Sequence, residues 1–242
     1  MSASTPELAG QTVVVIGGSL GIGLETARRA RAEGASVIIT ARNQERLQLA
    51  GKELGADTAA FDATDTDRLK EFFDDLPAPI DHILVTGPGP YYAPLEVFDF
   101  DKARDDIESH LFLPLQIAKL SIGRVRAGGS LSFMGGTGGR RTGVGLTLIG
   151  ALTAAMPALV RNLALEIAPI RVNLIAAGFV DTPLSATLLG DDLEARREQL
   201  RTTLPIGRVV GPEDIALLAV QLMNNPAVTG ATFDIDGGQQ LV

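Results

Sequence analysis

Residues 12–30 read TVVVIGGSLGIGLETARRA, and this stretch decides the expected fold. The β-branched run Thr12–Ile16 predicts a buried strand, and the amphipathic residues after the glycines predict a helix. Gly17, Gly21 and Gly23 lie in the turn between the two elements. A side chain there would hold the backbone away from a ligand, whereas the free N–H groups of a helix amino end attract anions. The stretch therefore predicts a pyrophosphate-binding loop, with a glycine-rich turn that binds nothing as the alternative.

The rest of the chain repeats the alternation of strand and helix. The expected strands are Thr12–Ile16, Ser36–Thr40, Thr58–Phe61, Ile80–Val85, Ser130–Met134, Arg171–Ile175 and Thr232–Ile235. The expected helices are Gly23–Glu33, Gln44–Leu54, Asp65–Leu76, Asp101–Arg126, Leu148–Ala168 and Pro212–Asn224, with a lid helix over Leu184–Thr203. Several strands are continuous apolar runs, which indicates that both faces are covered. The pattern predicts one α/β domain over residues 1–242, a doubly wound (Rossmann) fold with a parallel seven-stranded sheet and helices on both faces.

Composition narrows the possible partners. The chain has no cysteine, which excludes disulfides, thiolate zinc sites and cysteine nucleophiles and fits a cytoplasmic protein; we expect no metal. The formal net charge of −8 disfavours nucleic acid or an anionic membrane as the main partner. The first ten residues do not resemble a secretory signal, and Arg161 ends the apolar run from Leu146 before it could span a membrane. A small-molecule ligand is the remaining expectation.

Two positions after predicted strands concern the choice of cofactor. In folds that prefer NAD, an acidic residue after the second strand binds the ribose 2′-hydroxyl, but here Ala41 is followed by Arg42. Because arginine suits a 2′-phosphate, we expect NADP(H) to be preferred over NAD(H), unless Arg42 is a solvated helix residue. Asp62 is a candidate partner of the adenine amino group, with Ala63 packing nearby. The alternative role for Asp62 is a helix N-cap.

The chain also resembles the classical short-chain dehydrogenase/reductase family from about Leu8 to Val242. The matching segments are GGSLGIG, FDATD, LALEIAPIRVNLIAAGFVDTP, LPIGRVVGPEDIA and VTGATFDIDGG. The resemblance implies a homotetramer or homodimer and a set of cofactor-binding residues: Gly17, Ser19, Gly21, Ile22, Gly23, Gly87, Val180 and Thr182. One loop departs from the family, because Thr86-Gly87-Pro88-Gly89 stands where the family has Asn-Asn-Ala-Gly.

The resemblance also identifies the catalytic positions, and all four are changed. The family uses a tyrosine, a lysine four residues later, a serine and an asparagine. Alignment with that pattern places Ile149, Thr153, Gly136 and His110 there. No Tyr-x-x-x-Lys occurs anywhere in the chain, so the result does not depend on the register of the alignment. Because isoleucine has no proton to give and threonine has no charge, the family's standard proton transfer is not expected here.

Other side chains near these positions are candidate replacements. His110 titrates near neutrality, and Tyr91 and Tyr92 follow the fourth strand, so these three are the tentative catalytic residues. Arg140 and Arg141 follow the fifth strand and are candidates for binding an anionic substrate. The alternatives are a half-buried, hydrogen-bonded His110, a tyrosine that packs in the pocket wall, and arginines that are solvated or meet acidic residues at a subunit contact.

Three functions are consistent with the sequence. The first is an NADP(H)-dependent oxidoreductase of non-standard active site, in which His110 or a tyrosine supplies the proton. The second is a catalytically inactive NADP(H)-binding protein that acts as a sensor or as an oligomer partner. A third, weaker interpretation is a lyase or isomerase that uses His110 without hydride transfer.

Overall fold

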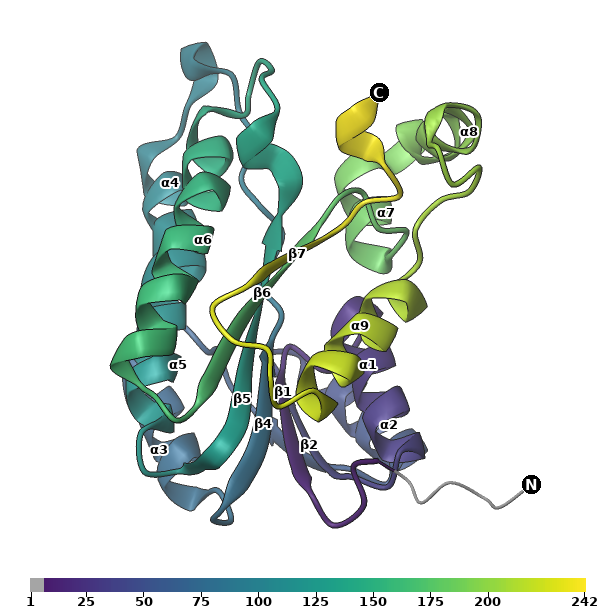
Figure 1. The fold of residues 1–242 in the computed structure, drawn as a ribbon. Helices are drawn as coiled ribbons and strands as arrows, with labels where there is room; N and C mark the ends of the chain where they lie inside the picture. Colours follow the sequence, from purple (N-terminus) through teal and green to yellow (C-terminus); the bar gives the residue numbers. More distant parts are fainter. Residues whose placement is uncertain (1–6) are drawn as a thin grey trace, which may run out of the picture.

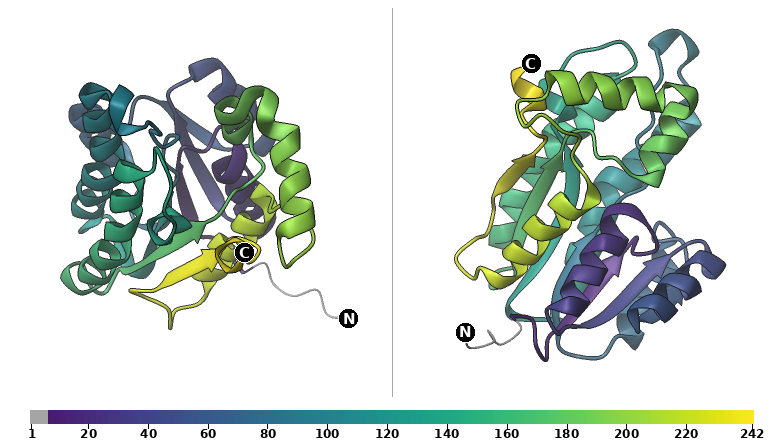
Figure 2. Two further views of the ribbon diagram at one scale, coloured as in Figure 1. Left: turned by 90° about the horizontal axis from the view of Figure 1, so that it is seen from above. Right: turned by 90° about the vertical axis from the view of Figure 1, so that its right-hand side faces the viewer.

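The computed structural model describes residues 7–242 as a parallel sheet of seven strands with helices on both faces (Figures 1 and 2). The strands are β1 Thr12–Ile16, β2 Ser36–Ala41, β3 Asp57–Ala60, β4 Ile80–Val85, β5 Val125–Gly136, β6 Arg171–Ala177 and β7 Thr232–Ile235. The α-helices are α1 Gly21–Ala32, α2 Gln44–Leu54, α3 Thr66–Asp75, α4 Phe100–Ile107, α5 Leu113–Ser121, α6 Thr147–Glu166, α7 Pro183–Leu189, α8 Leu193–Thr203 and α9 Pro212–Asn224. The remaining helical turns are η1 Leu95–Val97, the π-helical η2 Glu108–Phe112, η3 Thr137–Arg140, η4 Gly190–Asp192 and η5 Gln239–Leu241. The predicted fold class is confirmed.

The strand order places a switch point beside β1. The order is β3-β2-β1-β4-β5-β6-β7, so the chain builds outward from β1 in one direction and then in the other. Val14 of β1 pairs with Ile38 of β2 on one side and with Ile83 of β4 on the other. The loops that leave β1 and β4 therefore diverge at the carboxyl edge of the sheet, which is where ligands bind in folds of this kind.

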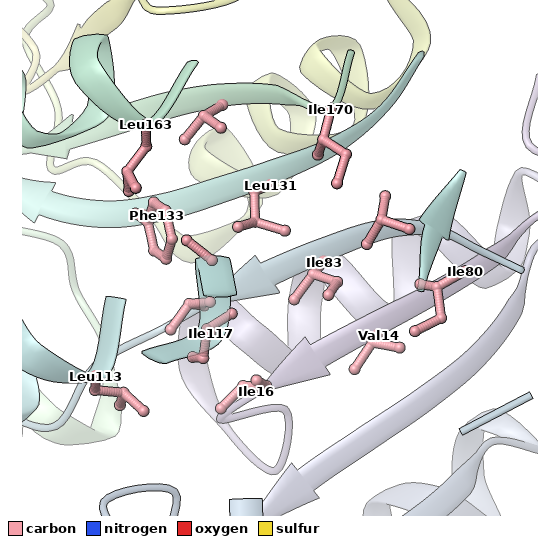
Figure 3. Packing of buried hydrophobic residues seen from close by; sticks show 14 of the residues in the cluster. Val14, Ile16, Ile80, Ile83, Leu113, Ile117, Leu131, Phe133, Leu163 and Ile170 are labelled. Carbon is pink, nitrogen blue, oxygen red and sulfur yellow. The ribbon is translucent and has the colours of Figure 1, made fainter. Parts of the chain in front are cut away.

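Alternate residues of β1 belong to two apolar cores. Val14 and Ile16 pack in the core beneath α3, α5 and α6 (Figure 3), whereas Val13 and Val15 pack beneath α1, α2 and α9. Both cores consist mainly of branched aliphatic side chains, with Phe73 and Phe133 among the fully buried residues of the first. This double cover explains why the strands read as continuous apolar runs in the sequence.

Two predicted helices differ from the structure. The helix expected over Asp101–Arg126 passes through the π-helical turn η2 and ends at Ser121, because Gly123 takes a positive φ of 77° and strand β5 already begins at Val125. The lid helix expected over Leu184–Thr203 is two helices, α7 and α8. Gly190, with a φ of 51°, breaks the helix between them.

Helix α6 is long and apolar enough to cross a membrane if only its length and composition are considered. One face of α6 packs against the sheet through Met156, Val160 and Leu163. The opposite face, which includes Ala151 and Ala158, is exposed. Only part of the helix is therefore covered by the chain itself.

Candidate functional site

A cavity of about 840 Å³ lies at the carboxyl ends of β1 and β4. Its walls come from the glycine loop before α1, the ends of β2 and β3, the loop after β4, one face of α4 and the start of α7. Most of the predicted cofactor residues line it, namely Gly17, Ser19, Gly21, Ile22, Gly23, Arg42, Asp62, Ala63, Gly87 and Thr182. The fold therefore brings together residues that follow five different strands around one cavity.

The glycine loop leaves no room for side chains. A Cβ on Gly23 would lie 2.2 Å from the carbonyl oxygen of Gly17, and a Cβ on Gly17 would lie 2.2 Å from Thr86 Oγ1. Gly17 also has a φ of 92°, which favours glycine. The N-cap residue of α1, Leu20, offers no side-chain hydrogen bond, so the first N–H groups of this helix remain available to an anion.

Thr86, which the sequence analysis did not single out, fixes the glycine loop to β4. Its Oγ1 donates to the carbonyl oxygen of Ile16 at 3.0 Å or of Gly17 at 3.1 Å. The threonine at the head of the altered Thr86–Gly89 loop therefore has a structural role. Farther along this loop a Cβ on Gly89 would lie 2.9 Å from Leu184 Cδ1, so the start of α7 lies against the loop after β4.

Positive side chains gather where β2 ends. Arg42 lines the cavity with its side chain 70% exposed, and its Nη1 atom lies 3.9 Å from Asp62 Oδ2. Arg46, which the sequence analysis did not single out, lines the same wall. The proposed N-cap role of Asp62 is wrong, because Asp65 caps α3 whereas Asp62 accepts hydrogen bonds from the main-chain N–H and the hydroxyl of Thr64.

The two predicted cofactor residues of the loop after β6 differ in position. Thr182 lines the cavity and caps α7 through a reciprocal pair of hydrogen bonds with Ser185. Gly21 approaches it closely, since a Cβ there would lie 3.5 Å from Thr182. Val180 is buried and forms an isolated parallel bridge with Val210, and its side chain is not part of the cavity wall.

His110 is partly buried and pairs with the buried Asp106, a residue that the sequence analysis did not single out. His110 Nδ1 lies 3.0 Å from Asp106 Oδ1 and 3.0 Å from the carbonyl oxygen of Asp106. Burial alone would lower the pKa of His110, but the hydrogen bond and the charge of Asp106 outweigh burial and raise this pKa above its ordinary value. Asp106 Oδ2 is buried without a hydrogen-bond partner among residues 7–242.

The other nitrogen of His110 is directed toward the cavity wall. A Cβ on Gly87 would lie 3.7 Å from His110 Nε2, which has no hydrogen bond within residues 7–242. His110 itself is not among the lining residues, but its neighbours Gly87 and Asp106 both are. Since Nδ1 is occupied, Nε2 is the atom of this imidazole that can exchange a proton with a ligand.

The two tyrosines have separate positions. Tyr91 lines the cavity, but its hydroxyl accepts a hydrogen bond from the main-chain N–H of Asp99 at 2.8 Å, and its ring packs on Phe98. The Tyr92 ring is half exposed and does not line the cavity. Burial of the Tyr92 hydroxyl and the charge of Asp106 raise its pKa, so this phenol is a poorer acid than a free tyrosine.

Arg140 and Arg141 do not face the cavity. Arg140 forms an ion pair with Asp234 and also donates to Gln240. Arg141 donates to the carbonyl oxygens of Gln239 and Val242. The expectation that this pair binds an anionic substrate is wrong, because both guanidinium groups attach the C-terminal segment to the loop after β5. Arg140 does meet an acidic residue, but within the same chain.

Comparison with known proteins agrees with the geometry. The sequence model of a protein family described as enoyl-(acyl carrier protein) reductase matches residues 17–240. The chain belongs to the short-chain dehydrogenase/reductase family. It is 31% identical to the NADP-dependent (R)-specific alcohol dehydrogenase of Lentilactobacillus kefiri, with 97% of this chain and 98% of that protein covered. It is 28% identical to the short-chain dehydrogenase/reductase ATR9 of Stachybotrys chlorohalonatus, with 96% and 98% covered.

Solved structures of other proteins share the whole fold. The MalC reductase/Diels–Alderase of Malbranchea aurantiaca superposes with a TM-score of 0.91 at 25% identity, covering 99% of this chain and all of that one. A small-chain dehydrogenase in complex with NADPH superposes with a TM-score of 0.82 at 26% identity, covering 96% and 99%. This chain therefore shares the fold of these reductases and dehydrogenases over nearly its full length.

The three positions on β5 and α6 that the sequence analysis aligned with catalytic residues of the family are Gly136, Ile149 and Thr153. The Ile149 side chain is buried, and Thr153 Oγ1 donates to the carbonyl oxygens of Ile149 at 2.8 Å and Gly150 at 3.2 Å. The hydroxyl of Thr153 is therefore engaged within α6. Its methyl group faces Gly136 instead, since a Cβ there would lie 3.4 Å from Thr153 Cγ2. These positions present hydrocarbon to each other and offer no titratable group.

Proposed function

We propose that this protein is an NADP(H)-dependent oxidoreductase with a non-standard active site, in which His110, held by Asp106, moves the proton between a carbonyl and an alcohol oxygen. The observation that carries the proposal is the pairing of the partly buried His110 with the buried Asp106 beside the cavity. The names of several relatives also support it, because they include an alcohol dehydrogenase and carbonyl reductases. The aligned family positions Gly136, Ile149 and Thr153 carry no titratable side chain.

The residues that would hold the cofactor fit a dinucleotide. The glycine loop allows the backbone to approach a pyrophosphate, and Arg42 and Arg46 suit a 2′-phosphate. When bound, NADP(H) would supply or accept the hydride. The protein's part is to bind and orient the reactants and to move a proton at His110 Nε2. Asp106 fixes the Nδ1–H tautomer of the neutral ring and stabilises the imidazolium, as a carboxylate does for other catalytic histidines.

The preference for NADP(H) can be tested by calorimetry with NADPH and NADH. We expect tighter binding of NADPH, and we expect Arg42→Ala to remove most of that advantage while NADH binding changes little. Arg68→Ala is the matched control, because Arg68 is an exposed arginine on α3 that pairs with Glu71. Equal affinity for the two cofactors in the unchanged protein would contradict the preference.

The proton-transfer role can be tested by following NADPH oxidation with a panel of aldehydes and ketones. We expect His110→Gln to lower kcat by roughly 10²–10⁴-fold with unchanged NADPH affinity, since this is the usual contribution of a general acid. Asp106→Asn should lower kcat and shift the alkaline limb of the pH profile for reduction to lower pH, because it removes the charge that raises the pKa of His110, which must be protonated to act as the acid. Tyr91→Phe and Tyr92→Phe serve as controls and should remain active.

The alternative is an NADP(H)-binding protein without catalysis, which acts as a sensor or an oligomer partner. Its support is that Ile149 and Thr153 carry no proton donor or ammonium group. Firm NADPH binding without turnover on the whole panel would favour this alternative, and turnover by the pure protein would eliminate it. If His110→Gln turned over as fast as the unchanged protein, a hydroxyl or a water molecule would have to supply the proton.

A further inference from the structure

Exposed apolar side chains lie on the segments that adjoin the cavity. We call this set the apolar rim: Tyr92, Leu95, Val97 and Phe100 before and within α4, Val144 before α6, and Leu184 and Leu188 of α7. Their side chains are between 38% and 89% exposed. Figure 1 shows α4 and the start of α6 on one side of the carboxyl edge of the sheet, and α7 on the other. Soluble proteins rarely expose this much apolar surface in one region without a ligand or partner for it.

Direct contacts connect the rim to the cavity. Leu184 lines the cavity and lies against Gly89, and Leu188 lies one turn later on α7. The loop that carries Val144 is joined to the segment before α4, because the N–H of Ala93 donates to the carbonyl oxygen of Gly145 at 3.3 Å. The segments that carry the apolar rim therefore adjoin the cavity, through Leu184 on one side and through Tyr91 on the other.

The charged residues at one end of the cavity favour an uncharged ligand. On α4 and η2 the cavity is lined by one cation, Lys102, and three acidic residues, Asp105, Asp106 and Glu108, whereas the two arginines after β5 are engaged with the C-terminal segment. A carboxylate or phosphate on the substrate would meet three acidic groups and only one cation, Lys102, on this wall of the cavity.

We infer that the substrate is an uncharged, largely apolar carbonyl compound whose hydrocarbon body lies on the apolar rim. This inference rests on the proposed function and names its substrate class. In the reduction, hydride from NADPH forms the new C–H bond at the carbonyl carbon, the C=O π pair moves to oxygen, and His110 Nε2 gives that oxygen its proton. The products are the alcohol and NADP⁺, and solvent returns the proton to His110.

The test separates the substrate class from catalysis. Calorimetry on the NADPH-loaded protein would compare 1-(2-naphthyl)ethanol, an alcohol product that cannot react with NADPH, with its 6-carboxylate analogue. We expect the uncharged alcohol to bind at least about tenfold more tightly, since the charge would have to leave water. This readout works even for a protein that turns nothing over, so a failure of the proposed function would not be mistaken for a failure of the inference.

Rim variants locate the binding surface. Val97→Glu and Leu188→Glu should each weaken binding of the uncharged alcohol about tenfold or more without changing NADPH affinity. Leu49→Glu is the matched control, because Leu49 is as exposed but lies on α2. Tighter binding of the carboxylate analogue would overturn the inference, and so would rim variants that bind the alcohol normally. A lower oligomer mass in the rim variants would also overturn it, since the rim would then be a contact between subunits.

Discussion

At the scale of single residues, Gly23 gives the most direct test of the glycine loop. A Cβ at this position would lie 2.2 Å from the carbonyl oxygen of Gly17, so the backbone of the loop must shift to accommodate alanine. We expect Gly23→Ala to weaken NADPH binding by at least about tenfold, because the loop can then no longer follow a pyrophosphate closely. Titration of NADPH fluorescence measures this. Gly150→Ala is the control, since the nearest atom to its Cβ is 4.0 Å away.

His82 makes stability depend on pH. It is buried in β4 between Ser130 and Gln11, at 2.8 Å from each, and burial lowers its pKa from 6.5 to about 4. Above pH 6.5 both folded and unfolded chains hold a neutral imidazole. As the pH falls below 6.5, the unfolded chain binds a proton that the folded chain does not bind, so stability falls until about pH 4.

The variant His82→Gln isolates this effect. Between pH 6.5 and 5 the unchanged protein should lose about 2 kcal/mol more unfolding free energy than the variant, because a difference of one pKa unit corresponds to about 1.4 kcal/mol. Urea unfolding at both pH values gives the loss of unfolding free energy for each protein. Subtracting the loss of the variant from that of the unchanged protein removes the contribution of the carboxylates, which titrate in both. Parallel losses in the two proteins would mean that His82 titrates normally.

The distance in sequence between interacting residues decided which parts of the site could be predicted. The glycine loop and Arg42 were placed correctly around the cavity, since their positions follow from the first two strands and the helix between them. Asp106 was missed although it precedes His110 by one helical turn, the spacing at which helix neighbours meet. The partners of Arg140 and Arg141 lie about a hundred residues further along the chain, and no local pattern could have indicated them.

At the scale of secondary-structure elements, Arg171 joins β6 to α9. Its buried guanidinium donates to the carbonyl oxygens of Leu222 at 2.8 Å and Met223 at 2.7 Å at the end of α9. It also donates to Gly128 at 3.1 Å and Val228 at 3.2 Å. Because the last carbonyl groups of a helix lack partners within the helix, one arginine here completes the hydrogen bonding of three segments.

Lysine cannot replace this arginine, because its ammonium lacks the planar set of five donors. We expect Arg171→Lys to lower the unfolding free energy by about 2–4 kcal/mol, the cost of leaving buried carbonyl groups unpaired. Arg208→Lys is the control and should cost less than about 1 kcal/mol, since the Arg208 side chain that pairs with Asp214 is 56% exposed. Urea unfolding measures both, and equal losses would mean that the four hydrogen bonds contribute little.

The strands could be predicted where an apolar run was long and residues that favour turns bounded it at both ends. All seven strands were expected within a few residues, apart from the start of β5, which pairs Val125 with Ile80 before a shift in register. That early start could not be read from Val125–Gly128, because a short polar and glycine-rich segment favours a loop. The strand forms there because β4 offers it an unpaired edge.

At the scale of the whole molecule, two helices leave apolar surface uncovered. Ala151, Ala158 and Leu165 are exposed on α6, and Phe112 and Leu115 are exposed at the start of α5. These elements lie side by side along one face of the sheet (Figure 1). Small residues on α6 would let a second helix approach closely, and the larger apolar residues would add buried area at the edges of such a contact.

We therefore expect the protein to be a homodimer or homotetramer with α5 and α6 at a subunit contact. Ala158→Arg and Leu165→Arg together should lower the mass measured by sedimentation equilibrium, because two charges would have to be buried without partners at each copy of the contact. Leu49→Arg on α2 should leave the mass unchanged, since Leu49 is exposed on a different helix. If the double variant kept the mass of the unchanged protein, the subunits would have to meet through other surfaces. Thermal unfolding that depends on protein concentration in the unchanged protein, and not in the double variant, would support this contact independently.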